Sequence, residues 1–266
     1  MIVAGLVLLS VGTADLVRQF VAPARRWIGM LIALAVVIAI GAFADAILPA
    51  LLGVALAGAW MWVMPSGKPA RAAFWPAVAL AVVCGGLVTL LGARDQPGLI
   101  GAVWHLPSPF GDVPFDYAIL VIGTIAFLLE SANVVVRSAL EVEMPAPFAA
   151  VIARPTSRSQ PEAVDAEEAE EETDAQDAVP LAVEPALKGG RLIGPLERVI
   201  VLALMLAGAY TLVAAVFAAK GIVRFPEISR DDGSGSRAEY FLVGSMVSWG
   251  LALAGALLVW WGSAAP

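Results

Sequence analysis

The chain has 266 residues, of which 60% are hydrophobic and 15% are charged, and its formal net charge is −7. A soluble domain of this length needs a more polar surface than this composition supplies, so an ordinary soluble fold is excluded. The hydrophobic residues come in runs of about 20, long enough to cross roughly 30 Å of hydrocarbon. The sequence therefore predicts an all-α, polytopic membrane protein with about seven transmembrane helices.

The predicted spans follow from the hydrophobic runs and their interruptions. The first run lacks the basic residues that precede the core of a signal peptide, so we interpret it as an uncleaved helix. The run at 27–64 is too long for one helix, and we expect a tight hairpin at Asp45 and Pro49 to divide it. In chain order the predicted spans are 2–22, 27–44, 46–64, 72–93, 116–137, 195–219 and 238–262.

A polar linker at 141–189 separates two membrane regions, an N-terminal one at 1–140 with about five spans and a C-terminal hairpin at 190–266. Residues 159–185 within the linker hold ten acidic residues and no basic one, so the rest of the chain is mildly basic. Such a segment buries too little apolar surface to offset chain entropy, and we expect it to be disordered.

The basic residues predict the orientation, because loops on the cytoplasmic side of a membrane are enriched in Lys and Arg. With the N-terminus outside, eleven bases lie inside and five outside, which places the linker and the C-terminus in the cytoplasm. The excess of Arg over Lys indicates a GC-rich bacterial genome and hence the bacterial cytoplasmic membrane. The five bases that this topology leaves outside are Arg94, Lys220, Arg224, Arg230 and Arg237.

Several charged residues fall inside predicted spans, where an isolated charge is costly. Glu130, Asn133 and Arg137 have the spacing i, i+3 and i+7 of one helix face. We expect Pro195 to begin the sixth span. The charges either pair between helices and fix their register, or line a polar pathway. The predicted intramembrane cluster is Asp15, Arg18, Glu130, Asn133, Arg137, Glu197 and Arg198.

The last two spans carry a second candidate cluster at the outer face, formed by Lys220, Arg224 and Glu239. In the predicted topology it lies at the opposite end of the hairpin from the charges that open the sixth span. In the seventh span, Ser245 and Ser248 share a face of small residues suited to close helix packing.

Most catalytic and metal-binding functions lack their sequence signatures here. The chain contains no HExxH, GxSxG, P-loop or GxGxxG motif. With a single cysteine, Cys84, and a single histidine, His105, one chain cannot form a disulfide framework or a His-based metal cluster. We therefore predict no catalytic residue, metal or cofactor, and the scattered bases indicate no nucleic-acid partner.

The C-terminal region, about 190–262, contains three ordered blocks: GRLIGPLER at 190–198, AAKGIVRF at 218–225 and EYFLVGS at 239–245. Together these blocks resemble an uncharacterised family of bacterial multi-pass membrane proteins. That family is marked by a Gly-x-x-Ile-Gly-x-Leu-Glu-Arg signature. The resemblance implies a helical membrane architecture and suggests that the charged residues of the blocks matter together.

Two functional hypotheses from different classes follow. The first is a non-enzymatic membrane scaffold or regulatory subunit, also open to homo-oligomerisation, whose segment 159–185 recruits a basic cytoplasmic protein. The alternative is a small-solute or ion transporter or channel whose polar pathway uses Asp15, Glu130 and Arg137.

Overall fold

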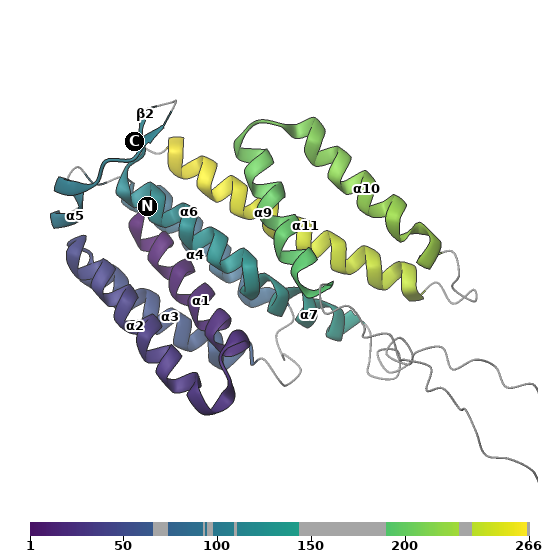
Figure 1. Cartoon of the computed structure of the whole chain (residues 1–266), viewed down its shortest axis with the longest axis horizontal. Coiled ribbons are helices and arrows are strands. Elements are labelled where there is room, and N and C mark those ends of the chain that lie inside the picture. The colour runs from purple at the N-terminus through teal and green to yellow at the C-terminus, as the bar shows by residue number, and fades with distance from the viewer. Residues whose placement is uncertain are drawn as a thin grey trace, which may run out of the picture.

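The computed structural model describes residues 1–65, 74–92, 94, 98–108, 111–143, 190–228 and 236–264. These residues are mostly helical, and the one sheet among them is a hairpin of two short strands (Figure 1). The predicted acidic linker segment, 159–185, lies outside the described residues. Among the described residues, four helical segments are long and apolar enough to cross a membrane: Ile2–Phe20, Pro23–Phe43, Phe115–Glu141 and Ala238–Ala264.

The first four helices match the first four predicted spans to within a few residues. The 3-10 turn η1 (Pro23–Arg25) joins the first two helices, with Pro23 at its start, where a missing N–H costs no helical hydrogen bond. Asp45 adopts a left-handed conformation with φ 52° between the second and third helices, which confirms the predicted hairpin. The four helices are α1 (Ile2–Phe20), α2 (Arg26–Phe43), α3 (Ile47–Val63) and α4 (Trp75–Leu91).

The middle of the chain forms one long helix that is entered through a small folded connection. Residues Phe115–Glu143 run continuously and include a widened π turn, so the fifth predicted span is confirmed and extended at its C-terminal end. The elements are α5 (Gly98–Val103), the antiparallel strands β1 (Pro107–Ser108) and β2 (Gly111–Asp112), then α6 (Phe115–Ala126), the π turn η2 (Phe127–Ser131) and α7 (Ala132–Glu143).

Helix α1 lies at the centre of the bundle and packs parallel to α6 at very short range. A Cβ added to Gly5 would lie 2.7 Å from the backbone nitrogen of Leu120, and one added to Gly12 would lie 2.5 Å from the carbonyl carbon of Ala126. From the α6 side, a Cβ on Gly123 would collide with the carbonyl oxygen of Gly5. Glycine at these positions lets the two backbones touch, as in other close-packed membrane helices.

The described part of the C-terminal region forms three helices: α9 (Gly190–Leu206), α10 (Tyr210–Ile228) and α11 (Ser236–Ala264). The single span predicted at 195–219 is therefore wrong, because the chain reverses at Gly208, whose φ is +71°. Hydropathy stays high through this turn, so the sequence pattern shows no break. The predicted helix start at Pro195 is also wrong, since α9 begins at Gly190 and Pro195 lies within it.

This reversal changes the course of the whole chain. Helices α9 and α10 form an antiparallel hairpin, and α11 then returns along α6 and α7 (Figure 1). A Cβ on Gly262 would lie 3.8 Å from Sδ of Met1, so α11 ends beside the N-terminus. The predicted placement of the two chain ends on opposite sides is therefore wrong. We call this end of the bundle the Met1 end and the other, where Arg18 lies, the Arg18 end.

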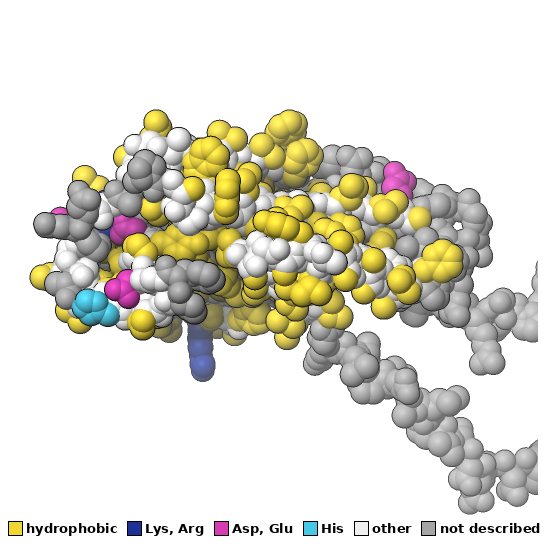
Figure 2. Space-filling model, turned by 90° about the horizontal axis from the view of Figure 1, so that it is seen from above, with side chains coloured by type: hydrophobic (Ala, Val, Ile, Leu, Met, Phe, Trp, Pro, Cys, Tyr) yellow, Lys and Arg dark blue, Asp and Glu magenta, His cyan; other side chains and the backbone are white. Residues whose placement is uncertain are grey.

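The outer surface is compatible with a membrane environment. Helix α2 buries only Val37 and Gly41 and exposes large hydrophobic side chains such as Leu31 and Ile32. Hydrophobic side chains cover most of the face seen in Figure 2. An exposed apolar surface of this extent is expected where lipid, rather than water, is the solvent.

Candidate functional site

The guanidinium group of Arg198 is the centre of a polar network inside the bundle. Arg198 projects from α9 and is only 3% exposed. Its Nε donates to Oγ of Ser248 at 2.9 Å, Nη1 to the carbonyl oxygen of Leu128 at 2.9 Å, and Nη2 to Oδ1 of Asn133 at 2.8 Å. One side chain thus joins α9 to α11, to the π turn and to α7. A rigid fork with several donors suits this task better than the single ammonium group of lysine.

The π turn η2 supplies two groups of this network, the carbonyl oxygen of Leu128 and the carboxylate of Glu130. The N–H of Ala132 bonds to the carbonyl oxygen of Phe127, five residues earlier, which widens the helix locally. Glu130, 5% exposed, lies in this turn and accepts a hydrogen bond of 3.2 Å from Nδ2 of Asn133. Single π turns occur often at functional positions. Arg198, beside the turn, interacts electrostatically with Glu130.

A second set of contacts extends the network to α10. Oε2 of Glu197 lies 2.7 Å from Nζ of Lys220, and Oε1 accepts a hydrogen bond of 2.6 Å from Nε1 of Trp249. Lys220 also lies 5.3 Å from the centre of the Trp249 ring, and Phe217 stacks on that ring at 4.1 Å. These contacts hold the hairpin of α9 and α10 against α11.

The contact between Glu197 and Lys220 differs from the predicted arrangement of charges in the C-terminal region. Glu197 and Lys220 were expected at opposite ends of the hairpin, but they form a direct ion pair. The expectation failed because it treated 195–219 as one helix. The reversal at Gly208 folds α10 back along α9 and brings the two residues side by side.

A third group of contacts holds α1 against α3. Asp15 is 1% exposed, and its Oδ1 lies 3.1 Å from Nη1 of Arg18, three residues further along α1. Nε1 of Trp60 donates to Oδ2 of Asp15 at 2.9 Å. Nη2 of Arg18 donates to the carbonyl oxygen of Met64 at 3.2 Å, at the end of α3. The pair thus satisfies its own charges and fixes α3 on α1.

The structure does not bring every candidate residue into these networks. Arg137 is exposed on α7, and Glu239 is exposed in the first turn of α11. The side chain of Arg224 lies outside the described residues. Ser245 and Ser248 are both buried on α11, as their spacing predicted.

The partly buried ion pair between Arg94 and Asp116 was not predicted from the sequence. Arg94 donates from Nε and Nη2 to the two carboxylate oxygens of Asp116, at 2.9 and 2.7 Å, and from Nη1 to the carbonyl oxygen of Ala44. The fork ties the start of α6 to the turn between α2 and α3. An acidic residue in the first turn of a span was the available signal, because it favours the helix dipole.

Arg94 keeps its charge in this ion pair at every ordinary working pH. Hydrogen bonds to Asp116, together with its charge, raise the pKa of Arg94 above the ordinary value. A cation whose pKa is raised on folding stabilises the fold at every pH below its unfolded pKa. For arginine that covers all ordinary working conditions, so protonation of Arg94 adds no pH dependence there.

Chemically, the networks consist of donors and acceptors that satisfy one another across helices. Within the described residues, no group of three or more His, Cys, Asp or Glu side chains could hold a metal ion. The contacts are suited to holding helices in register. Comparison with protein families, with curated protein sequences and with solved structures finds no match to this chain.

Proposed function

We propose that the chain is a multi-pass protein of the bacterial cytoplasmic membrane that acts as a non-enzymatic scaffold or regulatory subunit. Its acidic segment, 159–185, recruits a basic cytoplasmic protein by charge. The pairing of the buried charges supports this proposal. Asp15, Glu197 and Arg198 are each bound by groups from other helices, as residues that fix helix register would be.

The proposed orientation has the Met1 end outside the cell and the Arg18 end in the cytoplasm. Of the sixteen Lys and Arg residues, only Arg94 falls in a segment that connects helices at the Met1 end or follows α11. Because α9 and α10 form a hairpin, the bases from Lys220 to Arg237 join the cytoplasmic side. Of the five bases that the predicted topology left outside, only Arg94 remains outside. The new distribution of bases supports the positive-inside arrangement. Both chain ends are then outside.

Cysteine labelling tests this orientation. In a Cys84→Ala background, we expect a membrane-impermeant maleimide to label Asp112→Cys in intact cells. Glu239→Cys should be labelled only after permeabilisation, because α11 begins at the Arg18 end. Both positions are exposed, so a difference in labelling reports the side of the membrane. Labelling of Glu239→Cys in intact cells would refute the proposed side for the start of α11.

A membrane pull-down after cross-linking tests the scaffold function. We expect the intact chain to capture a partner in stoichiometric amounts and the chain without 159–185 to lose it. A matched variant, in which the ten acids of this segment become Asn or Gln, keeps the length and removes the charge. It should lose the partner as well. Recovery of the chain alone in all three samples would count against the proposal.

One observation favours the alternative, a small-solute or ion transporter. The fully buried Ser131 hydroxyl lies close to the carboxyl group of Asp15 but completes no hydrogen bond of standard geometry. An unsatisfied buried hydroxyl is a place where a water can be held. Under this alternative, Glu130→Gln abolishes the uptake of the solute or ion by proteoliposomes, while the yield of the purified protein is unchanged. Under the scaffold proposal, the Glu130→Gln protein captures its partner as the wild-type protein does.

A further inference from the structure

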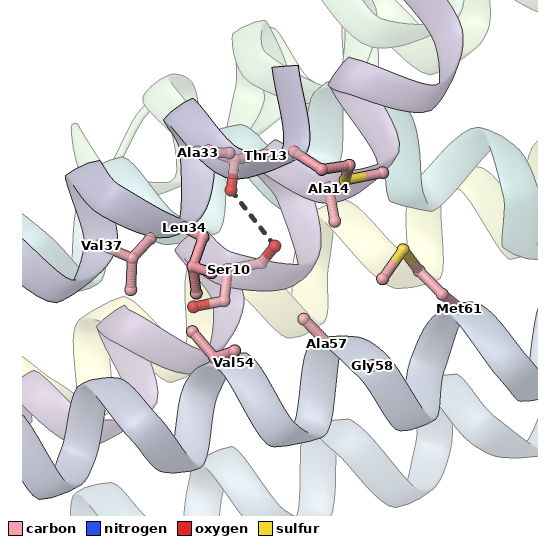
Figure 3. A pocket seen from close by; sticks show the side chains of 11 residues that line it. Ser10, Thr13, Ala14, Ala33, Leu34, Val37, Val54, Ala57, Gly58 and Met61 are labelled. Carbon is pink, nitrogen blue, oxygen red and sulfur yellow. Dashed lines mark hydrogen bonds between the residues drawn. The ribbon is translucent and has the colours of Figure 1, made fainter. Parts of the chain in front are cut away.

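A cavity of about 240 Å³ lies between α1, α2 and α3 and opens on one side of the bundle (Figure 3). Two hydroxyls border it, and each already donates its proton to a backbone carbonyl oxygen of α1. Oγ of Ser10 donates to the carbonyl oxygen of Leu6, and Oγ1 of Thr13 donates to that of Leu9, both at 2.6 Å. The remaining lining is apolar and includes Leu34 of α2.

The walls determine the chemical class of the occupant. An apolar cavity of about 150 Å³ already stays dry and takes up hydrocarbon, and this one is larger. Empty, it would forfeit the dispersion contacts of its lining. Met30 of α2 and Met61 of α3 both line the cavity, and their flexible thioether side chains adapt to a chain-like ligand. Since the cavity opens on the lipid-compatible face of the bundle, the available hydrocarbon is an acyl chain.

The charges near the cavity indicate the headgroup. Met30 lies one helical turn after Arg26, the first residue of α2. Arg25 precedes it at the end of η1 and is exposed, and Arg26 is half-buried. Trp27 beside them is 64% exposed, as is common for indole rings at the membrane interface. Two bases at the interface attract an anionic headgroup.

We propose that this cavity binds one acyl chain of an anionic phospholipid, with the phosphate held by Arg25 and Arg26. The lipid belongs to the leaflet at the Arg18 end. The site goes beyond the proposed scaffold function and does not depend on it. By filling the space between α1, α2 and α3, the lipid acts as a structural ligand of the N-terminal helices.

Photolabelling tests the acyl-chain site. The probe is phosphatidylglycerol with a diazirine in its acyl chain, in phosphatidylcholine vesicles that contain the full chain. We expect labelled peptides from the cavity walls around Met30 and Met61. Gly58→Leu should abolish this labelling. Gly58 lines the cavity, and a Cβ added there would meet no atom within 4 Å, so the leucine side chain can fill the cavity. Ala33→Leu, on the α2 wall, should do the same.

The matched control is Gly86→Leu in α4, whose Cβ position is equally open but does not line the cavity. This variant should keep the wild-type labelling. Equal labelling of the Gly58→Leu and Gly86→Leu proteins would overturn the site, and so would labelling spread evenly over all exposed helices.

A second comparison tests the headgroup. Replacing Arg25 and Arg26 by glutamine should lower labelling by phosphatidylglycerol about fivefold for each base lost. Labelling by a phosphatidylcholine probe with the same acyl diazirine should not change. If the two probes label the wild-type cavity equally, the anionic selectivity is refuted.

Discussion

Replacing Arg198 with methionine is expected to lower the free energy of unfolding by about 3–5 kcal/mol, the cost of breaking a buried charge network by removing one member. The substitution leaves the acceptors on Leu128, Asn133 and Ser248 without their donor. It also removes the cation that balances the buried carboxylate of Glu130. Unfolding of the purified protein in detergent, followed by circular dichroism, measures the loss.

Two further variants make this result specific. Arg198→Lys keeps the charge but cannot reach three acceptors at once, so an intermediate loss is expected. Arg137→Met removes the exposed arginine of α7 and should change stability by no more than about 0.5 kcal/mol. If Arg198→Met were as stable as Arg137→Met, the guanidinium would not hold these helices together.

Replacing Gly12 with valine is expected to cost about 3 kcal/mol, at the upper end of what overpacking usually costs. The first added carbon would lie 2.5 Å from the carbonyl carbon of Ala126, and a backbone atom cannot move aside as a side chain can. Helices α1 and α6 would have to separate. Because α1 is the central helix, that separation would disturb the packing around Asp15 and Trp60 as well.

Thermal unfolding and the yield of monodisperse protein in detergent measure this effect. The matched control is Gly85→Val in α4, where an added Cβ meets nothing within 4 Å. It should retain nearly wild-type stability. A Gly12→Val protein that unfolds at the same temperature as the control would show that α1 and α6 are not in backbone contact.

The structure gives the buried charges a physical role that their sequence positions left open. Arg198 binds acceptors on three neighbouring elements, and Glu197 is satisfied from both sides by Lys220 and Trp249. Bonds of this kind in a hydrophobic medium specify which helices meet and at what height. The scaffold proposal needs such a fixed bundle, since a docking platform must present its cytoplasmic segment from a defined position.

The sequence by itself determined where most helices begin and end. The hydrophobic runs predicted α1 to α4, the long helix at Phe115–Glu143 and α11, because the length and apolar character of a span are local properties. Asp45 marked the turn between α2 and α3 for the same local reason.

Only the tertiary structure decided how distant residues meet. The turn at Gly208 lies in a stretch whose hydropathy does not change, so the reversal depends on the positive φ of Gly208 and on the packing of α9 and α10 against α11. The pairs of Glu197 with Lys220 and of Arg94 with Asp116 join residues more than twenty positions apart. Periodicity along one helix carries no information on which helix lies opposite. These contacts therefore depend on the packing of the whole bundle.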